Sequence, residues 1–112
     1  MPVRSQLIAD LRLIVQIHDE PITVQCLKDA REREIAQGWI QPGIHTLAIA
    51  QAAEVRISLR EVQPYAEWTK LRLKELAGSR TAILADSPKV TALSHLLTEN
   101  VSDLRSMRVF ST

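Results

Sequence analysis

The side chains that most often carry out chemistry are few in this chain and lie far apart. Three histidines, His18, His45 and His95, fall on different predicted elements, and none has a cysteine, histidine or carboxylate at metal-ligand spacing. The one cysteine, Cys26, is followed by Lys28 near the start of a predicted helix, a setting that can favour a thiolate. A lone cysteine early in a helix is more often a small apolar side chain. We therefore predict no metal, no cofactor and no enzymatic activity.

Two serines lie where an anion could bind. Ser58 and Ser87 are each placed to cap a helix that should begin beyond the carboxyl end of a strand. In open α/β sheets, ligands and anions bind at that edge, helped by free helix N–H groups. Asp86, Ser87 and Lys89 would then line one mouth of a ligand site. Plain helix capping accounts for the same residues without any ligand.

The N-terminal segment has the pattern of a β-hairpin. Apolar and polar residues alternate over residues 11–18, with Ile14 as the exception, which is typical of a half-buried antiparallel strand with one polar face. A weaker strand around residues 6–9 precedes it, and Asp10 marks the turn. The predicted polar face carries Arg12, Gln16 and His18.

A first helix is predicted over about residues 24–37. Thr23 is placed to cap its start, and Gly38 to end it. Its amphipathicity is poor, because Arg31 falls on the apolar face that is formed by Val24, Leu27 and Ile35. The interleaved charges of residues 28–34 are typical of a solvated helix face rather than of a recognition surface.

The rest of the chain alternates strands and helices. Runs at residues 44–50 and 81–85 are apolar on both faces, which predicts central strands that are covered on both sides, and residues 107–110 predict a last strand. Ser58 with Glu61 has the spacing of a capping box, and a third helix should follow Ser87. Pro64 lies inside the second helix, so either that helix kinks there or its regular part begins there. Its predicted core stripe consists of Val62, Tyr65, Ala66, Thr69, Leu73 and Leu76.

The opposite face of the second helix is unusual. Pro64, Trp68 and Leu71 share it, and Glu75 is its one charged member. A tryptophan and a leucine on a solvent-facing stripe suggest contact with something, because tryptophan is enriched at the centres of protein interfaces. Three explanations remain open: self-association or a protein partner, cover by another segment of this chain, and contact with a membrane surface.

The length, composition and net charge of the chain argue against several classes of protein. With 112 residues, 46% apolar and 24% charged, the chain is long enough to form one domain with its own core. Its net charge of +1, with basic and acidic residues interleaved, argues against nucleic-acid binding, which requires a basic excess. No window approaches the length of a membrane span, so no stable membrane insertion is expected. A single cysteine fits a reducing compartment, and we expect a cytoplasmic protein.

These elements predict an α/β domain with a mixed sheet of about five strands, including the N-terminal hairpin, and about three helices. Their order is similar to that of the STAS-like (SpoIIAA-like) family, which is related to the anti-sigma-factor antagonists and is bacterial and largely uncharacterised. The segments that carry the likeness span nearly the whole chain, residues 1–112. They are residues 13–17, Ile22-Thr23, Pro42-Gly43-Ile44, Ile57-Ser58, residues 82–88 and residues 108–110.

The resemblance implies a function in regulation or binding, and two departures modify it. Phospho-regulated members carry an Asp-Ser-Ser-Gly type turn after the third strand, whereas residues 48–53 read Ala-Ile-Ala-Gln-Ala-Ala here, without a hydroxyl group. Many relatives also continue past the last strand into a final helix, whereas this sequence ends at Ser111-Thr112, so that helix is absent, trimmed or replaced by the surface of a partner. We predict a non-enzymatic binding or regulatory domain that acts through protein contacts as a homodimer, with Trp68 in the contact. The alternative is a domain that binds a small apolar ligand or a lipid, since the family is related in fold to CRAL-TRIO domains.

Overall fold

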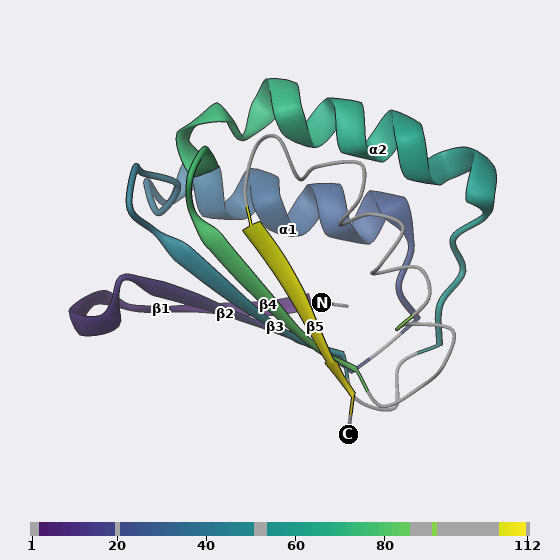
Figure 1. Cartoon of the computed structure of the whole chain (residues 1–112), viewed down its shortest axis with the longest axis horizontal. Helices are drawn as coiled ribbons and strands as arrows, with labels where there is room; N and C mark the ends of the chain where they lie inside the picture. The colour runs from purple at the N-terminus through teal and green to yellow at the C-terminus, as the bar shows by residue number, and fades with distance from the viewer. Residues whose placement is uncertain (1–2, 20, 51–53, 86–90, 92–105, 112) are drawn as a thin grey trace.

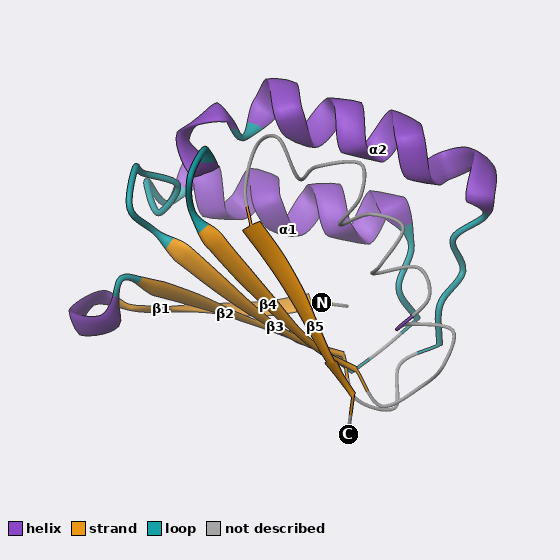
Figure 2. Cartoon of the chain, viewed as in Figure 1, coloured by secondary structure: helices purple, strands orange, loops and turns teal. Residues whose placement is uncertain are grey.

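The computed structural model describes residues 3–19, 21–50, 54–85, 91 and 106–111, and it has an α/β fold (Figures 1 and 2). A mixed five-stranded sheet has the strand order β1-β2-β3-β4-β5. The elements are β1 (Val3–Ile8), β2 (Leu13–His18), α1 (Val24–Ala36), β3 (His45–Ala50), α2 (Leu59–Arg72), β4 (Arg80–Ala85) and β5 (Ser106–Ser111), with short 3-10 helices at Ala9–Leu11 and Lys74–Leu76. The α/β class and the mixed sheet that the sequence predicts are thus confirmed. Of the predicted third helix only Thr91 is described, and it is helical; the rest lies outside the described residues.

The topology decides which face of the sheet the helices cover. β1 pairs antiparallel with β2, and the remaining neighbours pair in parallel. From β2 to β3 and from β3 to β4 the chain moves one strand in the same direction each time, through α1 and then α2. Parallel connections of this kind are almost always right-handed, so both helices must lie on the same face. Figure 1 shows α1 and α2 side by side over one side of the sheet.

The predicted hairpin is confirmed, but its polar face is not exposed. A tight turn joins β1 to β2 and ends at Arg12, whose left-handed backbone (φ 48°) is otherwise typical of glycine or asparagine. On β2, Ile14, Gln16 and His18 are 0%, 6% and 3% exposed. The face that carries the polar Gln16 and His18 is therefore the one under the helices, and the prediction of a solvent-facing polar side was wrong.

Both ends of α1 agree with the local signals in the sequence. The side chain of Thr23 accepts a hydrogen bond from the Cys26 N–H at the start of the helix. At the other end, the Trp39 N–H donates to Glu34 O (3.0 Å) and the Gly38 N–H donates to Ile35 O (2.9 Å). With Gly38 at φ 76°, this is a Schellman motif, which fixes the direction in which the chain leaves the helix.

The start of α2 shows whether the helix begins before Pro64 or at it. The Glu61 carboxylate accepts a hydrogen bond from the Ser58 N–H (3.0 Å), as expected of a capping box, and the Ser58 hydroxyl also donates to this carboxylate (3.2 Å). The helix begins at Leu59 and continues through Pro64, so the interpretation in which its regular part begins at the proline was wrong. The predicted core stripe is confirmed, since all six of its members are buried, namely Val62, Tyr65, Ala66, Thr69, Leu73 and Leu76.

The apolar core lies between the sheet and its two helices. One cluster includes Ile14, Ile44, Leu73 and Leu76, and a second cluster is formed by Ile22, Ala50, Val55 and Ala85. No described helix covers the opposite face of the sheet. The described residues therefore meet the prediction that β3 and β4 are covered on both sides for one face only, and the other face stays a prediction.

Candidate functional site

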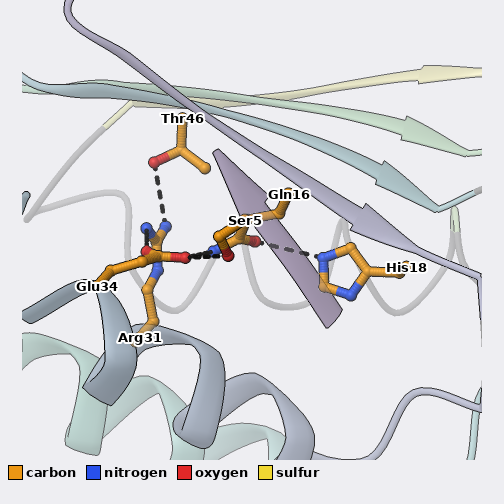
Figure 3. A network of polar contacts seen from close by, with 6 residues as sticks. All are labelled: Ser5, Gln16, His18, Arg31, Glu34 and Thr46. Atoms are coloured by element: carbon orange, nitrogen blue, oxygen red, sulfur yellow. Dashed lines mark hydrogen bonds and ion pairs between the residues drawn. The ribbon is translucent and has the colours of Figure 1, made fainter. Parts of the chain in front are cut away.

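A buried polar network lies between α1 and the sheet, and Figure 3 shows its six side chains. Glu34 is at its centre and is 0% exposed. Its Oε1 accepts a hydrogen bond from Arg31 Nη1 at 2.8 Å, and its Oε2 accepts from Ser5 Oγ and from Gln16 Nε2, each at 2.8 Å. One carboxylate on α1 thus ties the helix to β1 and to β2.

Arg31 extends the network to β3. Its Nη1 forms the ion pair with Glu34, and its Nη2 donates to Thr46 Oγ1 at 3.2 Å. The guanidinium is 5% exposed, so this pair belongs to the interior rather than to the surface. The expectation that the charged run of residues 28–34 is a solvated face is therefore corrected, since Ala30, Arg31 and Glu34 all point into the protein.

His18 closes the network on the side of β2. The Gln16 amide donates to Glu34, which leaves its Oε1 to face His18, so the Nε2–H of the imidazole donates across 3.3 Å. The other ring nitrogen, Nδ1, is buried and has no hydrogen-bond partner among the described residues. Burial, followed by the nearby charge of Arg31, lowers the pKa of His18 from 6.5 to about 4.

The network is built for structure rather than for chemistry. A general base or nucleophile must reach the group on which it acts, within about 3 Å. Glu34 is fully enclosed and three donors occupy its oxygens, while the imidazole of His18 is 3% exposed. Within the described ranges, no three His, Cys, Asp or Glu side chains lie close enough together to hold a metal ion. We conclude that these residues orient α1 on the sheet.

Of the residues predicted to bind an anion, only Ser58 is described by the structure. Ser58 lies at the start of α2, where its N–H and hydroxyl both bond Glu61. This is the plain capping arrangement that was left open beside the ligand site. Asp86, Ser87 and Lys89 lie outside the described residues.

Cys26, near the start of α1, is a half-buried free thiol whose Sγ lies 3.0 Å from Thr23 Oγ1.

The predicted contact face of α2 divides into a covered part and an exposed part. The ring of Trp68 stacks on Tyr65, with 6.0 Å between the ring centroids, and Lys28 Nζ lies 5.6 Å from its centroid. Trp68 also packs against the cluster that contains Ile14 and Leu73. The interpretation of Trp68 as a solvent-facing residue is therefore corrected, because this chain covers much of it. Pro64 and Leu71 remain exposed.

The open face of the sheet is the most conspicuous surface in the structure. The register of β2, β3 and β4 brings seven half-buried apolar side chains together on it, and none belongs to either core cluster. They are Leu13, Val15, Ile17, Leu47, Ile49, Ala82 and Leu84. We call this set the open apolar face. A contiguous apolar surface on three neighbouring strands is typical of an interaction site.

Sequence reasoning missed both the network and the open apolar face. The signal for the network was Arg31 among the apolar positions of the first helix. The signal for the open face was the strand order, because successive parallel connections in one direction leave one side of a sheet bare.

No described helix is long and apolar enough to cross a membrane. Comparison with protein-family models, with curated proteins and with solved structures found no match to this chain.

Proposed function

We propose that this protein is a non-enzymatic binding or regulatory module that acts through protein contacts and forms a homodimer. The observation that carries the proposal is the open apolar face. Its Leu, Ile and Val side chains occupy the central strands of the sheet, where a soluble monomer would gain by carrying polar groups. A second copy is the occupant that is available wherever this chain is present, and closed symmetric dimers are the commonest assemblies.

The size of the sheet fits such a contact. Five strands spaced by about 4.8 Å, each with six residues that rise about 3.3 Å, present a face of about 24 Å by about 20 Å. Taken over all five strands, two such faces remove about 1,000 Å² from water, which is near the lower limit for a specific interface. Two sheets pack face to face at a distance of about 10 Å, with their side chains interdigitated. We expect a dimer that dissociates on dilution rather than a permanent one.

The charges at the rim of the face favour a two-fold arrangement. At the amino ends of β3 and β4 lie His45 and the exposed Arg80. Near the opposite end, Asp19 forms an exposed ion pair with Arg4 at 2.7 Å. A two-fold axis across the strands brings the Arg80 end of one copy against the Asp19 end of the other. Arg80 of each copy then faces the Asp19–Arg4 pair of the other, and its attraction to the Asp19 carboxylate favours this register of the dimer.

The test is the mass of the protein in solution, measured by sedimentation over a range of concentrations. The central substitution is Val15→Lys, which buries an ammonium group in the proposed interface, and Leu47→Lys repeats the experiment at its register partner. Both variants should be monomeric at concentrations where the wild type is dimeric. Gln63→Lys, at an exposed position of α2 on the other side of the sheet, is the matched control and should stay dimeric.

A second substitution separates this surface from the back of α2. Leu71→Lys changes a side chain that is 71% exposed on that helix and should leave the dimer intact. A wild-type monomer at all concentrations would refute the proposed dimer. A dimer that Leu71→Lys dissociates and Val15→Lys does not would move the contact to α2. Circular dichroism of each variant shows whether the fold is retained.

The STAS-like arrangement and a cytoplasmic location are part of the same proposal. The hairpin followed by alternating helices and parallel strands supports the former, and the free Cys26 thiol supports the latter. Binding of an apolar ligand or a lipid is the alternative function. It requires an enclosed apolar cavity, and a native mass spectrum of the purified protein that shows a bound lipid would favour it over the dimer.

A further inference from the structure

A cleft at the amino ends of the parallel strands has features that neither the fold nor the proposed dimer explains. It has a volume of about 380 Å³ and lies between the β1–β2 turn and the loop that joins α1 to β3. Apolar walls come from Leu7, Pro42 and Ile44, and Trp39 adds a large flat ring. Arg12 and Gln41 supply the polar groups. The lining is thus about equally polar and apolar, and a hollow with apolar walls and a few convergent polar groups can hold a small molecule.

The fold alone does not explain why an arginine occupies position 12. Its backbone is left-handed (φ 48°, ψ 51°), a conformation that strains an arginine and suits a glycine. Its side chain makes no hydrogen bond or ion pair with any residue that the structure describes. The hairpin turn therefore gains nothing from the guanidinium. Backbone strain that is kept at a cleft points to a function for the side chain that it positions.

The exposed guanidinium of Arg12 lies against the loop that joins α1 to β3. A Cβ atom at Gly43 would come within 3.4 Å of Arg12 Nη1, so the side chain of Arg12 rests on the bare backbone of that glycine. Gly43 itself is left-handed, with φ 86°. The planar fork has five N–H donors with no partner among the described residues, and it lines the cleft. This is the group that recognises a carboxylate or a phosphate with two parallel hydrogen bonds.

The opposite wall is rigid and carries no competing acid. The Schellman motif at Gly38 fixes Trp39, whose N–H bonds Glu34 O, and Gln41 Nε2 donates to Gly38 O at 2.7 Å. The carbonyl groups at this end of α1 are thus largely satisfied within the loop and do not repel an anion in the cleft. Gln41 Oε1 stays free to accept a hydrogen bond. None of the residues that line the cleft is an aspartate or a glutamate.

We propose that this cleft binds a small organic anion with a flat apolar body, whose carboxylate pairs with Arg12 and whose ring lies against Trp39. The site is distinct from the open apolar face, so it does not rest on the proposed dimer. The edge is also opposite to the carboxyl ends of the strands, where ligands of open α/β sheets usually bind.

The probe is 2-naphthoate, and its neutral analogue 2-naphthalenemethanol is the matched control. The chain has two tryptophans, so the two indole N–H signals of the ¹⁵N-labelled protein report the cleft (Trp39) and a residue outside its lining (Trp68) in one titration. Naphthoate should shift the Trp39 signal with a dissociation constant on the order of 1 mM and leave the Trp68 signal unmoved. The neutral analogue should bind at least about tenfold more weakly.

Arg12→Gly is the decisive variant, because glycine keeps the left-handed turn while it removes the guanidinium. It should weaken naphthoate binding at least about tenfold and should leave binding of the alcohol unchanged. Arg80→Gln removes a charge from the same edge of the sheet outside the cleft and should bind naphthoate as the wild type does. The proposal is overturned if Trp39 shows no saturable shift up to about 10 mM naphthoate. It is equally overturned if Arg12→Gly binds as tightly as the wild type, or if Trp39 and Trp68 shift alike.

Discussion

Replacing Glu34 by glutamine tests the buried network with a change of one functional group. The amide has the shape of the carboxyl group, so no cavity forms, and its oxygen can still accept the hydrogen bond from Arg31 Nη1. Its NH₂ group, however, takes the place of Oε2, which accepts from Gln16 Nε2 at 2.8 Å, and two donors then face each other. The positive charge of Arg31 also loses its counter-ion in a place where the residue is 4% exposed.

The expected loss follows from that geometry. Removing one partner of a buried ion pair costs about 3–5 kcal/mol, since the other charge stays buried without compensation. A domain of this size has a free energy of unfolding of about 5–15 kcal/mol, so Glu34→Gln should remove a large fraction of it. Urea unfolding, followed by circular dichroism, measures the difference. Glu32→Gln on the same helix is the matched control, because the carboxylate of Glu32 pairs with Arg72 at the surface, and it should change stability little.

A double-mutant cycle with Arg31→Met separates the ion pair from the rest of the network. Each single variant leaves one charge alone in the interior, whereas the double variant leaves none. The loss for the double variant should therefore be smaller than the sum of the single losses by about 2 kcal/mol or more. Additive losses, or a cost below about 1 kcal/mol for Glu34→Gln, would show that water reaches the pair. The packing of α1 on β2 described above would then be wrong.

Two further predictions concern His18 and the end of α1. The pKa of His18 is lowered from 6.5 to about 4 in the folded protein, so the unfolded chain binds more protons between these two values. The free energy of unfolding should therefore fall by up to about 3 kcal/mol as the pH drops from 6.5 to 4, and the contribution of His18 should then level off. Urea midpoints measured across this range should show a shallower slope for His18→Asn, and identical slopes would contradict the burial of the imidazole. Gly38→Ala forces a methyl group onto a residue at φ 76° that has open space around it, so it should cost about 1 kcal/mol through backbone strain alone. Gly38→Asn, which tolerates this conformation better, should cost less in the same thermal melts, and a reversed order would contradict the Schellman motif.

The features that the sequence predicts correctly depend on local chemistry. Thr23, Gly38 and the Ser58–Glu61 pair act within four residues of themselves, so their roles can be predicted without knowledge of the fold. The core stripe of α2 follows from helical spacing alone.

The features that the sequence did not reveal depend on distant partners. Alternation along β2 shows that the strand has two different faces, but which face is covered depends on where α1 lands, and that is set by the topology. Arg31 looks misplaced on an apolar helix face until Thr46 and Glu34 are brought beside it. Trp68 looks exposed until Tyr65 and Lys28 are seen to flank its ring.

The two faces of β2 together bear on the proposed dimer. The side under the helices carries Gln16 and His18, which require a complete set of polar partners, whereas the bare side carries Leu13, Val15 and Ile17. For a sheet with water on its bare side, the reverse assignment would be more stable, because apolar groups would enter the core and polar groups would stay hydrated. Among the described residues no segment covers Leu13, Val15 and Ile17, and the second copy that we propose would supply an apolar surface for them. Exchanging Val15 for threonine, which has a similar shape and β-propensity, should therefore weaken the dimer while it leaves the unfolding of the monomer nearly unchanged.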